Sequence, residues 1–228
     1  MAASTLLISG TDTGVGKTTL TACLATYCQI YHPDRRLGIY KPIQSGIGDR
    51  EYFRAALNLP YALEQITPLY YQTPVASAIA ARREQQPVDL GLLWQHLQTW
   101  QAHTDLLLVE GMGGLGSPIT WEYLNADLAR DWHLPVVLAV PLRLGAMGQA
   151  IAHLALARLA QVQVIGLVVC CTEPHSRQYL EDWFPPALIS RLLTVPILGI
   201  LPYVPDLRDR SALARAAAQL ELGYLGIF

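Results

Sequence analysis

Six short apolar runs recur along this chain of 228 residues, and stretches with helical periodicity lie between them. We predict strands at Thr5–Ser9, Leu37–Tyr40, Leu106–Val109, Pro135–Val140, Val164–Val169 and Ile197–Leu201. We predict helices at Lys17–Ile30, Leu90–Gln101, Ala146–Ala160, Arg177–Leu193 and Ser211–Leu222. Continuously apolar strands separated by helices are typical of a parallel sheet covered on both faces. The pattern therefore predicts a doubly wound α/β fold with a mostly parallel sheet.

The segment from about residue 45 to 88 interrupts this alternation. It is rich in proline and tyrosine and holds only two short helical patches, Glu51–Leu57 and Ser77–Arg83. No repeat or low-complexity linker divides the chain, and its length suits one α/β domain. We therefore expect residues 1–228 to form a single domain, with an irregular excursion near the strand ends where ligands of such sheets bind.

Composition excludes several classes of function. The net charge of −2 gives no reason to expect a nucleic-acid partner. No apolar run approaches the roughly 18 residues of a membrane span, and no signal-like segment precedes the first strand. The four cysteines have apolar neighbours, as expected for buried thiols in a reducing compartment. These features together favour a cytoplasmic protein that does not act at a membrane.

A glycine-rich loop, Gly10–Thr19, follows the first predicted strand and opens the first predicted helix. Glycines let backbone N–H groups turn toward phosphate oxygens, and the helix adds the dipole of its N-terminus. Lys17 can then reach the β- and γ-phosphates, while the Thr18 hydroxyl can bind Mg²⁺. We therefore expect a nucleoside triphosphate with Mg²⁺ at Gly14, Val15, Gly16, Lys17, Thr18 and Thr19, although the first glycine stands one residue too early for the usual spacing. This loop indicates a fold of the P-loop NTPase type.

Lysine is rare in this chain. Of sixteen basic residues, only Lys17 and Lys41 are lysines. Lysine is a compact point charge, whereas arginine is a wide planar fork, so sites that need the compact cation resist the exchange. Lys41 follows the second predicted strand, at the edge of the sheet where the crevice is expected, and can neutralise charge that develops in phosphoryl transfer. Both lysines are therefore our candidate catalytic residues.

Two acidic residues are candidates for the metal. Glu110 follows the apolar run Leu106–Val109 and precedes Gly111, Met112 and Gly113, which we also expect near the nucleotide. A carboxylate there faces the phosphate loop across the crevice, and Mg²⁺ prefers oxygen ligands. Asp49 is the second candidate, but the residue alone is equally consistent with an ordinary loop aspartate.

At these residues the chain resembles the dethiobiotin synthetase family. The resemblance lies in the variant phosphate loop Gly10–Thr19, the lysine segment Tyr40–Gly46, the turn Val109–Gly114 and the fourth strand with its following loop, Pro135–Gly148. These segments occur in the family's order over nearly the whole chain. The resemblance implies an ATP-dependent ligase of biotin biosynthesis that acts on 7,8-diaminononanoate and carbon dioxide. One amine takes up carbon dioxide as a carbamate, the γ-phosphate activates the carbamate as a mixed anhydride, and the second amine closes the cyclic urea.

The resemblance also implies roles for individual residues. Lys17 and Lys41 would hold the phosphate and the carbamate, Ser45 would bind the diamine or its carbamate, and Mg²⁺ would be held by Thr18, Asp49 and Glu110. The start of the helix at Leu144, Gly145 and Gly148 would offer N–H groups to the substrate carboxylate from the other subunit, which implies a homodimer with interfacial sites.

Two departures from the family pattern bear on specificity. Gly14 stands where the family often has a glutamate in the phosphate loop. Cys170 and Cys171 stand where many members have Asn-Asp to read adenine, and a thiol scarcely replaces an amide as donor and acceptor. The segment Pro202, Tyr203 and Val204 matches the other base-side segment and can hold a base through backbone contacts. The preferred nucleobase therefore stays open, with ATP or another nucleoside triphosphate as co-substrate.

Three other classes of protein share parts of this pattern. A partner-regulated ATPase switch of the chromosome-partitioning type shares the fold, but it needs a second lysine early in the phosphate loop, where this chain has Asp12. A guanine-specific switch needs an Asn-Lys-x-Asp base reader that the sequence lacks. An amidating synthetase of the corrin pathway would carry a further glutamine-hydrolysing domain, for which the chain is too short.

Overall fold

Six parallel strands form the central sheet in the order β2-β5-β1-β6-β7-β8. The computed structural model describes residues 3–193 and 195–227. The strands are β1 (Ser4–Gly10), β2 (Leu37–Tyr40), β5 (Leu106–Gly114), β6 (Val136–Pro141), β7 (Val164–Cys170) and β8 (Ile197–Leu201). The predicted parallel α/β architecture is confirmed, because every predicted strand lies in this sheet.

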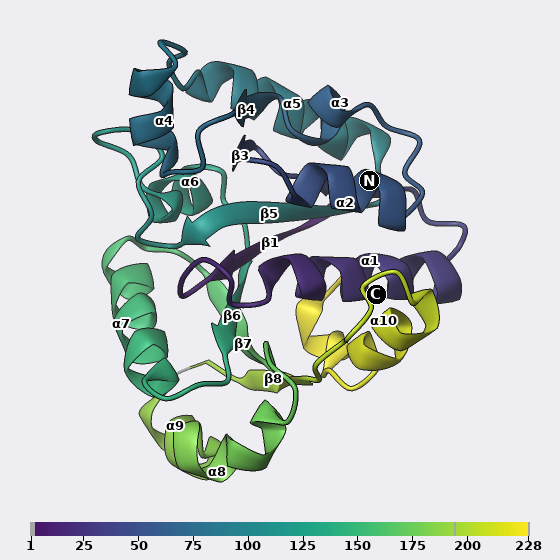
Figure 1. The fold of residues 1–228 in the computed structure, drawn as a ribbon, viewed down its shortest axis with the longest axis vertical. Helices are drawn as coiled ribbons and strands as arrows, with labels where there is room; N and C mark the ends of the chain where they lie inside the picture. Colours follow the sequence, from purple (N-terminus) through teal and green to yellow (C-terminus); the bar gives the residue numbers. More distant parts are fainter. Residues whose placement is uncertain (1–2, 194, 228) are drawn as a thin grey trace.

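Helices cover both faces of the sheet (Figure 1). The helices are α1 (Lys17–Tyr31), α5 (Leu90–His103), α6 (Asn125–Asp131), α7 (Ala146–Leu159), α9 (Pro186–Leu192) and α10 (Arg210–Ala217). Side chains alternate along the strands, so Leu6 and Ile8 pack with α1 and α10, while Leu7 joins the core beneath α5, α6 and α7. The sheet is therefore apolar on both faces, as the continuous runs predicted.

The segment after β2 contains a second, two-stranded parallel sheet, formed by β3 (Ile43–Ser45) and β4 (Leu69–Tyr71). Three helices accompany it: α2 (Asp49–Ala56), α3 (Leu63–Ile66) and α4 (Ser77–Arg83). Figure 1 shows these elements gathered beyond β5, on the same side of the molecule as α5. The segment carries Ser45 and Asp49 at the end of β3 and the start of α2, where both reach the site described below.

Two helix predictions need correction. The predicted helix Arg177–Leu193 is divided into a 3₁₀ turn (Ser176–Tyr179), α8 (Leu180–Trp183) and α9. The division falls at Pro185 and Pro186, because proline has no N–H to continue the helical hydrogen bonds and restricts the residue before it. The predicted helix Ser211–Leu222 ends early, since α10 stops at Ala217 and a separate 3₁₀ turn (Leu222–Leu225) follows.

Strand β5 is longer than the apolar run that predicted it. It continues through the glycine-rich segment to Gly114, which pairs with Gly10 of β1. Glu110 pairs with Ile8 and therefore lies inside the strand, not beyond its end as we predicted. The carboxylate is completely buried at the centre of the sheet, so it requires charged or hydrogen-bonding partners.

Within the described residues, no helix combines the length and the apolar character needed to cross a membrane.

Candidate functional site

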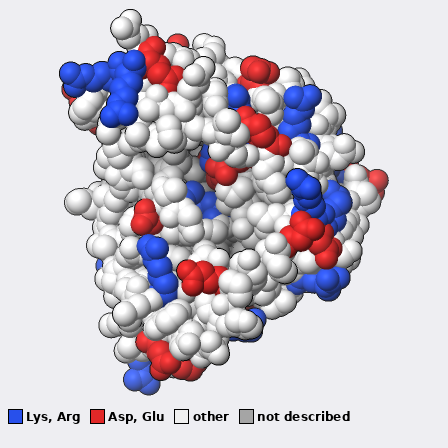
Figure 2. Space-filling view, in the orientation of Figure 1, with Lys and Arg blue, Asp and Glu red and all other residues white. Residues whose placement is uncertain are grey.

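The carboxyl ends of the parallel strands meet at one edge of the sheet, where a cavity of about 800 Å³ opens. Strand β1 has β5 on one side and β6 on the other, which makes the loop after β1 a topological switch point. Lys41 directly follows β2, Cys170 ends β7 and Leu201 ends β8, and all three line the cavity. The topology thus brings residues from four separate segments to one crevice. A hollow near the centre of the face in Figure 2 has basic side chains at its base beside acidic ones.

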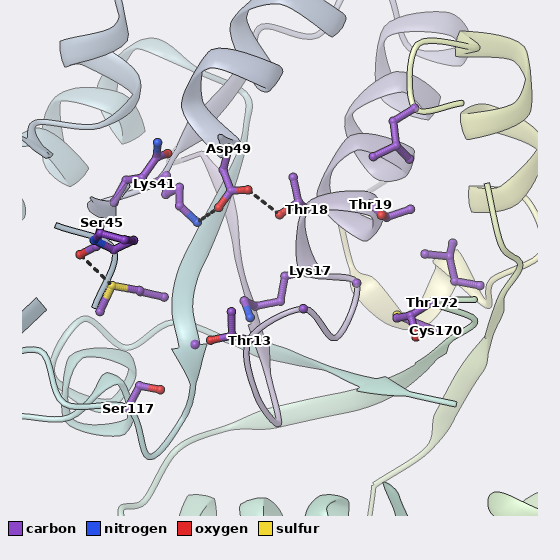
Figure 3. A pocket seen from close by; sticks show the side chains of 18 of the residues that line it. Thr13, Lys17, Thr18, Thr19, Lys41, Ser45, Asp49, Ser117, Cys170 and Thr172 are labelled. Carbon is purple, nitrogen blue, oxygen red and sulfur yellow. Dashed lines mark hydrogen bonds and ion pairs between the residues drawn. The ribbon is translucent and has the colours of Figure 1, made fainter. Parts of the chain in front are cut away.

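The cavity has a consistent order of residues from one end to the other (Figure 3). Ser45 and Lys41 lie at one end, Lys17 and Thr18 lie in the middle, and Cys170 lies at the far end. Its lining includes the residues that we predicted at Gly14, Gly16, Lys17, Thr18, Thr19, Lys41, Ser45, Asp49, Met112, Gly113, Cys170, Cys171, Tyr203 and Val204. Both lysines therefore serve one cavity, as the sequence predicted.

The phosphate loop depends on glycine at two positions. Gly14 and Gly16 have φ values of +69° and +98°, a backbone conformation that L side chains rarely adopt. A Cβ at Gly16 would also lie 2.8 Å from the Cβ of Cys170, so the loop packs closely against the end of β7. The Lys17 ammonium donates a hydrogen bond to the carbonyl of Asp12 at 2.7 Å and closes the loop on itself.

Lys41 lies between the two acidic residues that we predicted as metal ligands. Its ammonium is 2.6 Å from Asp49 Oδ2 and 2.7 Å from Glu110 Oε1. The Lys41 side chain is only 4% exposed, while Asp49 retains a more open position at the cavity wall. The three groups form an ion-pair cluster in which one buried cation is shared between a buried and a partly exposed carboxylate.

Thr18 completes this cluster from α1. Its hydroxyl lies 3.1 Å from Asp49 Oδ1 and 3.2 Å from Glu110 Oε1. One turn further along the helix, the Thr21 hydroxyl contacts Glu110 Oε2 at 2.9 Å. Three hard oxygen-bearing groups, Thr18, Asp49 and Glu110, therefore converge on one point, which is the ligand chemistry that suits Mg²⁺.

Burial and charge shift the pKa values of this cluster in different directions. Burial acts to lower the pKa of Lys41, but Glu110 and Asp49 outweigh it and raise the pKa above its usual value. Burial acts to raise the pKa of Asp49, but the Lys41 ammonium and its hydrogen bond hold it below its usual value. The pKa of Lys17 is lowered, chiefly because burial disfavours its charged form. An anion that bound beside Lys17 would favour the ammonium form.

Several predicted residues do not line the cavity. Val15 is buried in the core, and Gly111 and Pro202 are not part of the lining. Glu110 is also outside the lining: it is fully buried and contacts the lining residues Lys41 and Thr18. The start of α7 also lies outside the lining: Leu144 is 79% exposed, and Gly145 and Gly148 have open space beside their α-carbons. The expectation that these three residues act from a partner subunit is untested by a single chain.

Sequence reasoning missed the side wall of the cavity and one hydrogen bond to Glu110. Thr21 lies four residues after Lys17, on the helix face that turns toward β5, and this spacing was the available signal. Three of the missed lining residues lie in segments that we had singled out: Thr13 in the phosphate loop, Gln44 in the lysine segment and Leu201 at the end of a predicted strand. The others come from segments with no motif: Pro74, Val75, Ala76, Ser117, Pro118, Thr172, Pro205 and Leu207. Thr172 directly follows the two cysteines and was the easiest of these to find.

The far end of the cavity is dominated by thiols and apolar groups. Cys170 is buried, its pKa is raised by burial, and its thiol is directed at the carbonyl of Val168, 3.7 Å away. Cys171, Leu201 and Val204 add further apolar surface, while Tyr203 is partly exposed. This end can hold a flat ring by packing, but its thiols are weak hydrogen-bonding groups.

Comparisons with known proteins agree with this geometry. The family model described as AAA domain matches residues 4–211. An ATP-dependent dethiobiotin synthetase BioD of Crocosphaera subtropica is 44% identical over 222 residues, which cover 97% of this chain and 99% of that protein. The protein of the same name from Gloeobacter violaceus is 46% identical over 221 residues, covering 97% of this chain and 95% of its own length.

Solved structures show the same fold at low sequence identity. A ParA family ATPase from Chlorobium tepidum superposes with a TM-score of 0.58 at 13% identity, covering 98% of this chain and 96% of that one. The MinD cell division protein of Aquifex aeolicus gives a TM-score of 0.57 at 16% identity, with coverage of 97% and 95%. At such identities the likeness concerns the fold alone.

Proposed function

This chain belongs to the ATP-dependent dethiobiotin synthetases, ligases of biotin biosynthesis with an AAA-type P-loop domain, and from this premise we propose how its cavity performs the reaction. The substrates are 7,8-diaminononanoate, carbon dioxide and a nucleoside triphosphate. The observation that carries the proposal is the placement of both lysines, Lys17 and Lys41, in one cavity, close to Thr18 and the two carboxylates.

The order of groups along the cavity matches the order of the reactants. In this proposal the triphosphate would lie along the phosphate loop, with its base toward Cys170 and its γ-phosphate toward Lys41, two residues that lie at opposite ends of the cavity (Figure 3). The diamine would lie beyond the γ-phosphate, next to Ser45 and Met112. The Ser45 hydroxyl oxygen is 3.9 Å from the Met112 sulfur. Positioning the two reactants in line supplies much of the rate enhancement for such a transfer.

The chemistry then proceeds in three balanced steps. One amine of the substrate adds to carbon dioxide, loses a proton and becomes a carbamate. A carbamate oxygen attacks the γ-phosphorus, and the nucleoside diphosphate leaves with the bridging electrons. The second amine attacks the carbamate carbon and loses a proton, phosphate leaves with the electrons of the C–O bond, and the cyclic urea closes. The ammonium groups of Lys17 and Lys41 neutralise the negative charge that shifts during phosphoryl transfer.

The residues present fit a magnesium ion. The Thr18 hydroxyl lies 3.1 Å from an oxygen of Asp49 and 3.2 Å from an oxygen of Glu110, and hard oxygen ligands are those that Mg²⁺ prefers. When bound, the ion neutralises phosphate charge and orients the triphosphate. Asp49 and Glu110 would hold the ion, and Thr21 keeps the Glu110 carboxylate oriented through its hydrogen bond.

We further propose that two chains form a cytoplasmic homodimer in which the start of α7 reaches the partner's cavity. The exposed Leu144 and the open backbone at Gly145 and Gly148 support this assignment, because N–H groups there are free to approach a substrate carboxylate. Sedimentation should give twice the chain mass of 25.1 kDa. A monomer with full activity would rule out the interfacial site.

The test of the function is turnover with defined substrates. The protein incubated with ATP, MgCl₂, bicarbonate and 7,8-diaminononanoate should release ADP and form dethiobiotin in equal amounts, detected by mass spectrometry. Without the diamine, ADP release should fall to background. A partner-regulated ATPase of the ParA or MinD type, the alternative suggested by fold, would instead hydrolyse ATP without the diamine and form no dethiobiotin.

A further inference from the structure

Lys41 occupies the place that the metal ligands define. Its ammonium contacts one oxygen of Asp49 and one of Glu110, at 2.6 and 2.7 Å. The Thr18 hydroxyl contacts the same Glu110 oxygen and the second oxygen of Asp49. The proposed ligand set for Mg²⁺ is thus already satisfied by a cation that belongs to the chain itself.

A divalent ion and this ammonium cannot share the site unchanged. A magnesium ion bound to Glu110 Oε1 at about 2.1 Å would lie within about 5 Å of the Lys41 ammonium, given the 2.7 Å ion pair. Like charges at that separation repel strongly where water is scarce, and Lys41 is buried. The ion and the ammonium would therefore compete for the same carboxylate oxygens, Asp49 Oδ2 and Glu110 Oε1.

We propose that Lys41 is a built-in counter-ion for the carboxylates of the proposed metal site, and that metal binding displaces its ammonium from Asp49 and Glu110 toward the substrates. This inference rests on the proposed metal role of Thr18, Asp49 and Glu110. In the free protein the lysine neutralises two carboxylates, one of them fully buried. When the triphosphate arrives with its metal, the metal takes over that task, and the incoming phosphate offers the ammonium a new partner.

This displacement would make the catalytic position of Lys41 depend on the binding of metal and nucleotide. Lys41 faces the reacting groups only after metal and nucleotide are both in place, so the free protein keeps this charge away from other anions. Lys17 differs, because its ammonium contacts the Asp12 carbonyl and neither carboxylate. The two lysines of the chain therefore have different partners before substrate binds, and this difference provides a matched control.

The experiment measures Mn²⁺ binding to the nucleotide-free protein by electron paramagnetic resonance. Lys41→Met removes the ammonium but keeps an apolar stem in the buried space, and it should tighten Mn²⁺ binding by about tenfold or more. Lys17→Met should tighten Mn²⁺ binding by a clearly smaller factor, because Lys17 makes no ion pair with the ligands and interacts with Glu110 and Asp49 only at longer range. Equal or weaker binding by Lys41→Met, or no binding by any of the three proteins, would overturn the displacement.

Two further measurements test the displacement without relying on the Mn²⁺ titration or on catalytic activity. Mg²⁺ should raise the unfolding temperature of Lys41→Met and Lys41→Gln more than that of the wild type, since the variants leave two carboxylates without a cation. A crystal structure of the wild type with Mg²⁺ and a non-hydrolysable ATP analogue should show the Lys41 ammonium away from at least one carboxylate. If both contacts persist beside the metal, the inference is wrong. Dethiobiotin formation by the wild type reports separately on the proposed function.

Discussion

The two ends of the active-site cavity differ in the kind of interaction that they offer. At one end, the buried Lys41 ammonium lies 2.6 Å from Asp49, which lines the cavity, and 2.7 Å from Glu110, which is buried next to it. The end that contains Cys170 and Cys171 is lined mainly by thiols and apolar side chains. Charges that are fixed in a dry site stabilise a transition state, whereas apolar surface only holds a ring in place. From this difference we predict that the cavity discriminates between nucleobases less strongly than it selects the triphosphate.

The largest expected effect lies at the charged end. Lys41→Gln should lower kcat by about a thousandfold or more, because its charge matters most as phosphoryl transfer proceeds. The affinity for a fluorescent ATP analogue should change by less than about fivefold, since Lys17 and the loop backbone still hold the phosphates. Rapid-mix assays of dethiobiotin formation and equilibrium titrations measure the two quantities. Near-normal turnover would show that Lys41 has no role in the reaction.

A smaller effect is expected from removing a hydrogen bond to Glu110, and it can be compared with the removal of a buried hydroxyl that makes no hydrogen bond. Thr21→Val removes the donor to Glu110 and should destabilise the fold by about 1–3 kcal/mol, because a buried carboxylate oxygen loses its partner. Thr26→Val on the same helix is the control. Its hydroxyl is buried and makes no hydrogen bond within the described residues, so the change should be neutral or stabilising. Urea unfolding of the three proteins makes the comparison, and equal losses would contradict the role of Thr21.

The ion pairs at the charged end also predict a dependence on pH. The pKa of Asp49 is lowered by Lys41, so its contribution to stability is complete above about pH 4 and is lost as pH falls through the folded-state pKa. The pKa of Lys41 is raised, so its contribution is complete below about pH 10 and is lost only above the folded-state value. The stability difference between wild type and Asp49→Asn should therefore be constant from about pH 5 to 9 and shrink in acid. A difference that grows in acid would contradict this assignment.

The smallest effects are expected at the thiol end. Values of kcat/KM for ATP, GTP and CTP should lie within about a hundredfold of one another, since packing discriminates far less than paired hydrogen bonds. Cys171→Ala should alter these ratios by less than about threefold, because the thiol reads little of the base edge. A preference for ATP above about a thousandfold would show that backbone groups near Tyr203 read adenine after all.

Local patterns in the sequence were sufficient for the architecture and for the phosphate loop. Alternating strands and helices follow from apolar periodicity. The glycines of the loop indicated a tight turn, and the structure confirms positive φ values at Gly14 and Gly16. The rarity of lysine singled out Lys17 and Lys41 without any contact being known. The helix breaks at Pro185 and Pro186 were also readable from local chemistry, and overlooking them caused the error at α8 and α9.

The pairing of charges could not be read in this way, because it depends on contacts between distant segments. Lys41 and Glu110 are 69 residues apart in sequence and meet because β2 and β5 are neighbours in the sheet. Glu110 lies inside β5 because the glycine-rich segment continues to pair with β1. No local sequence pattern predicted this continued pairing. Local propensity acts over a few residues, whereas strand order and loop packing bring together groups from the whole chain. That Lys41 holds the two carboxylates in the free protein follows from this long-range arrangement.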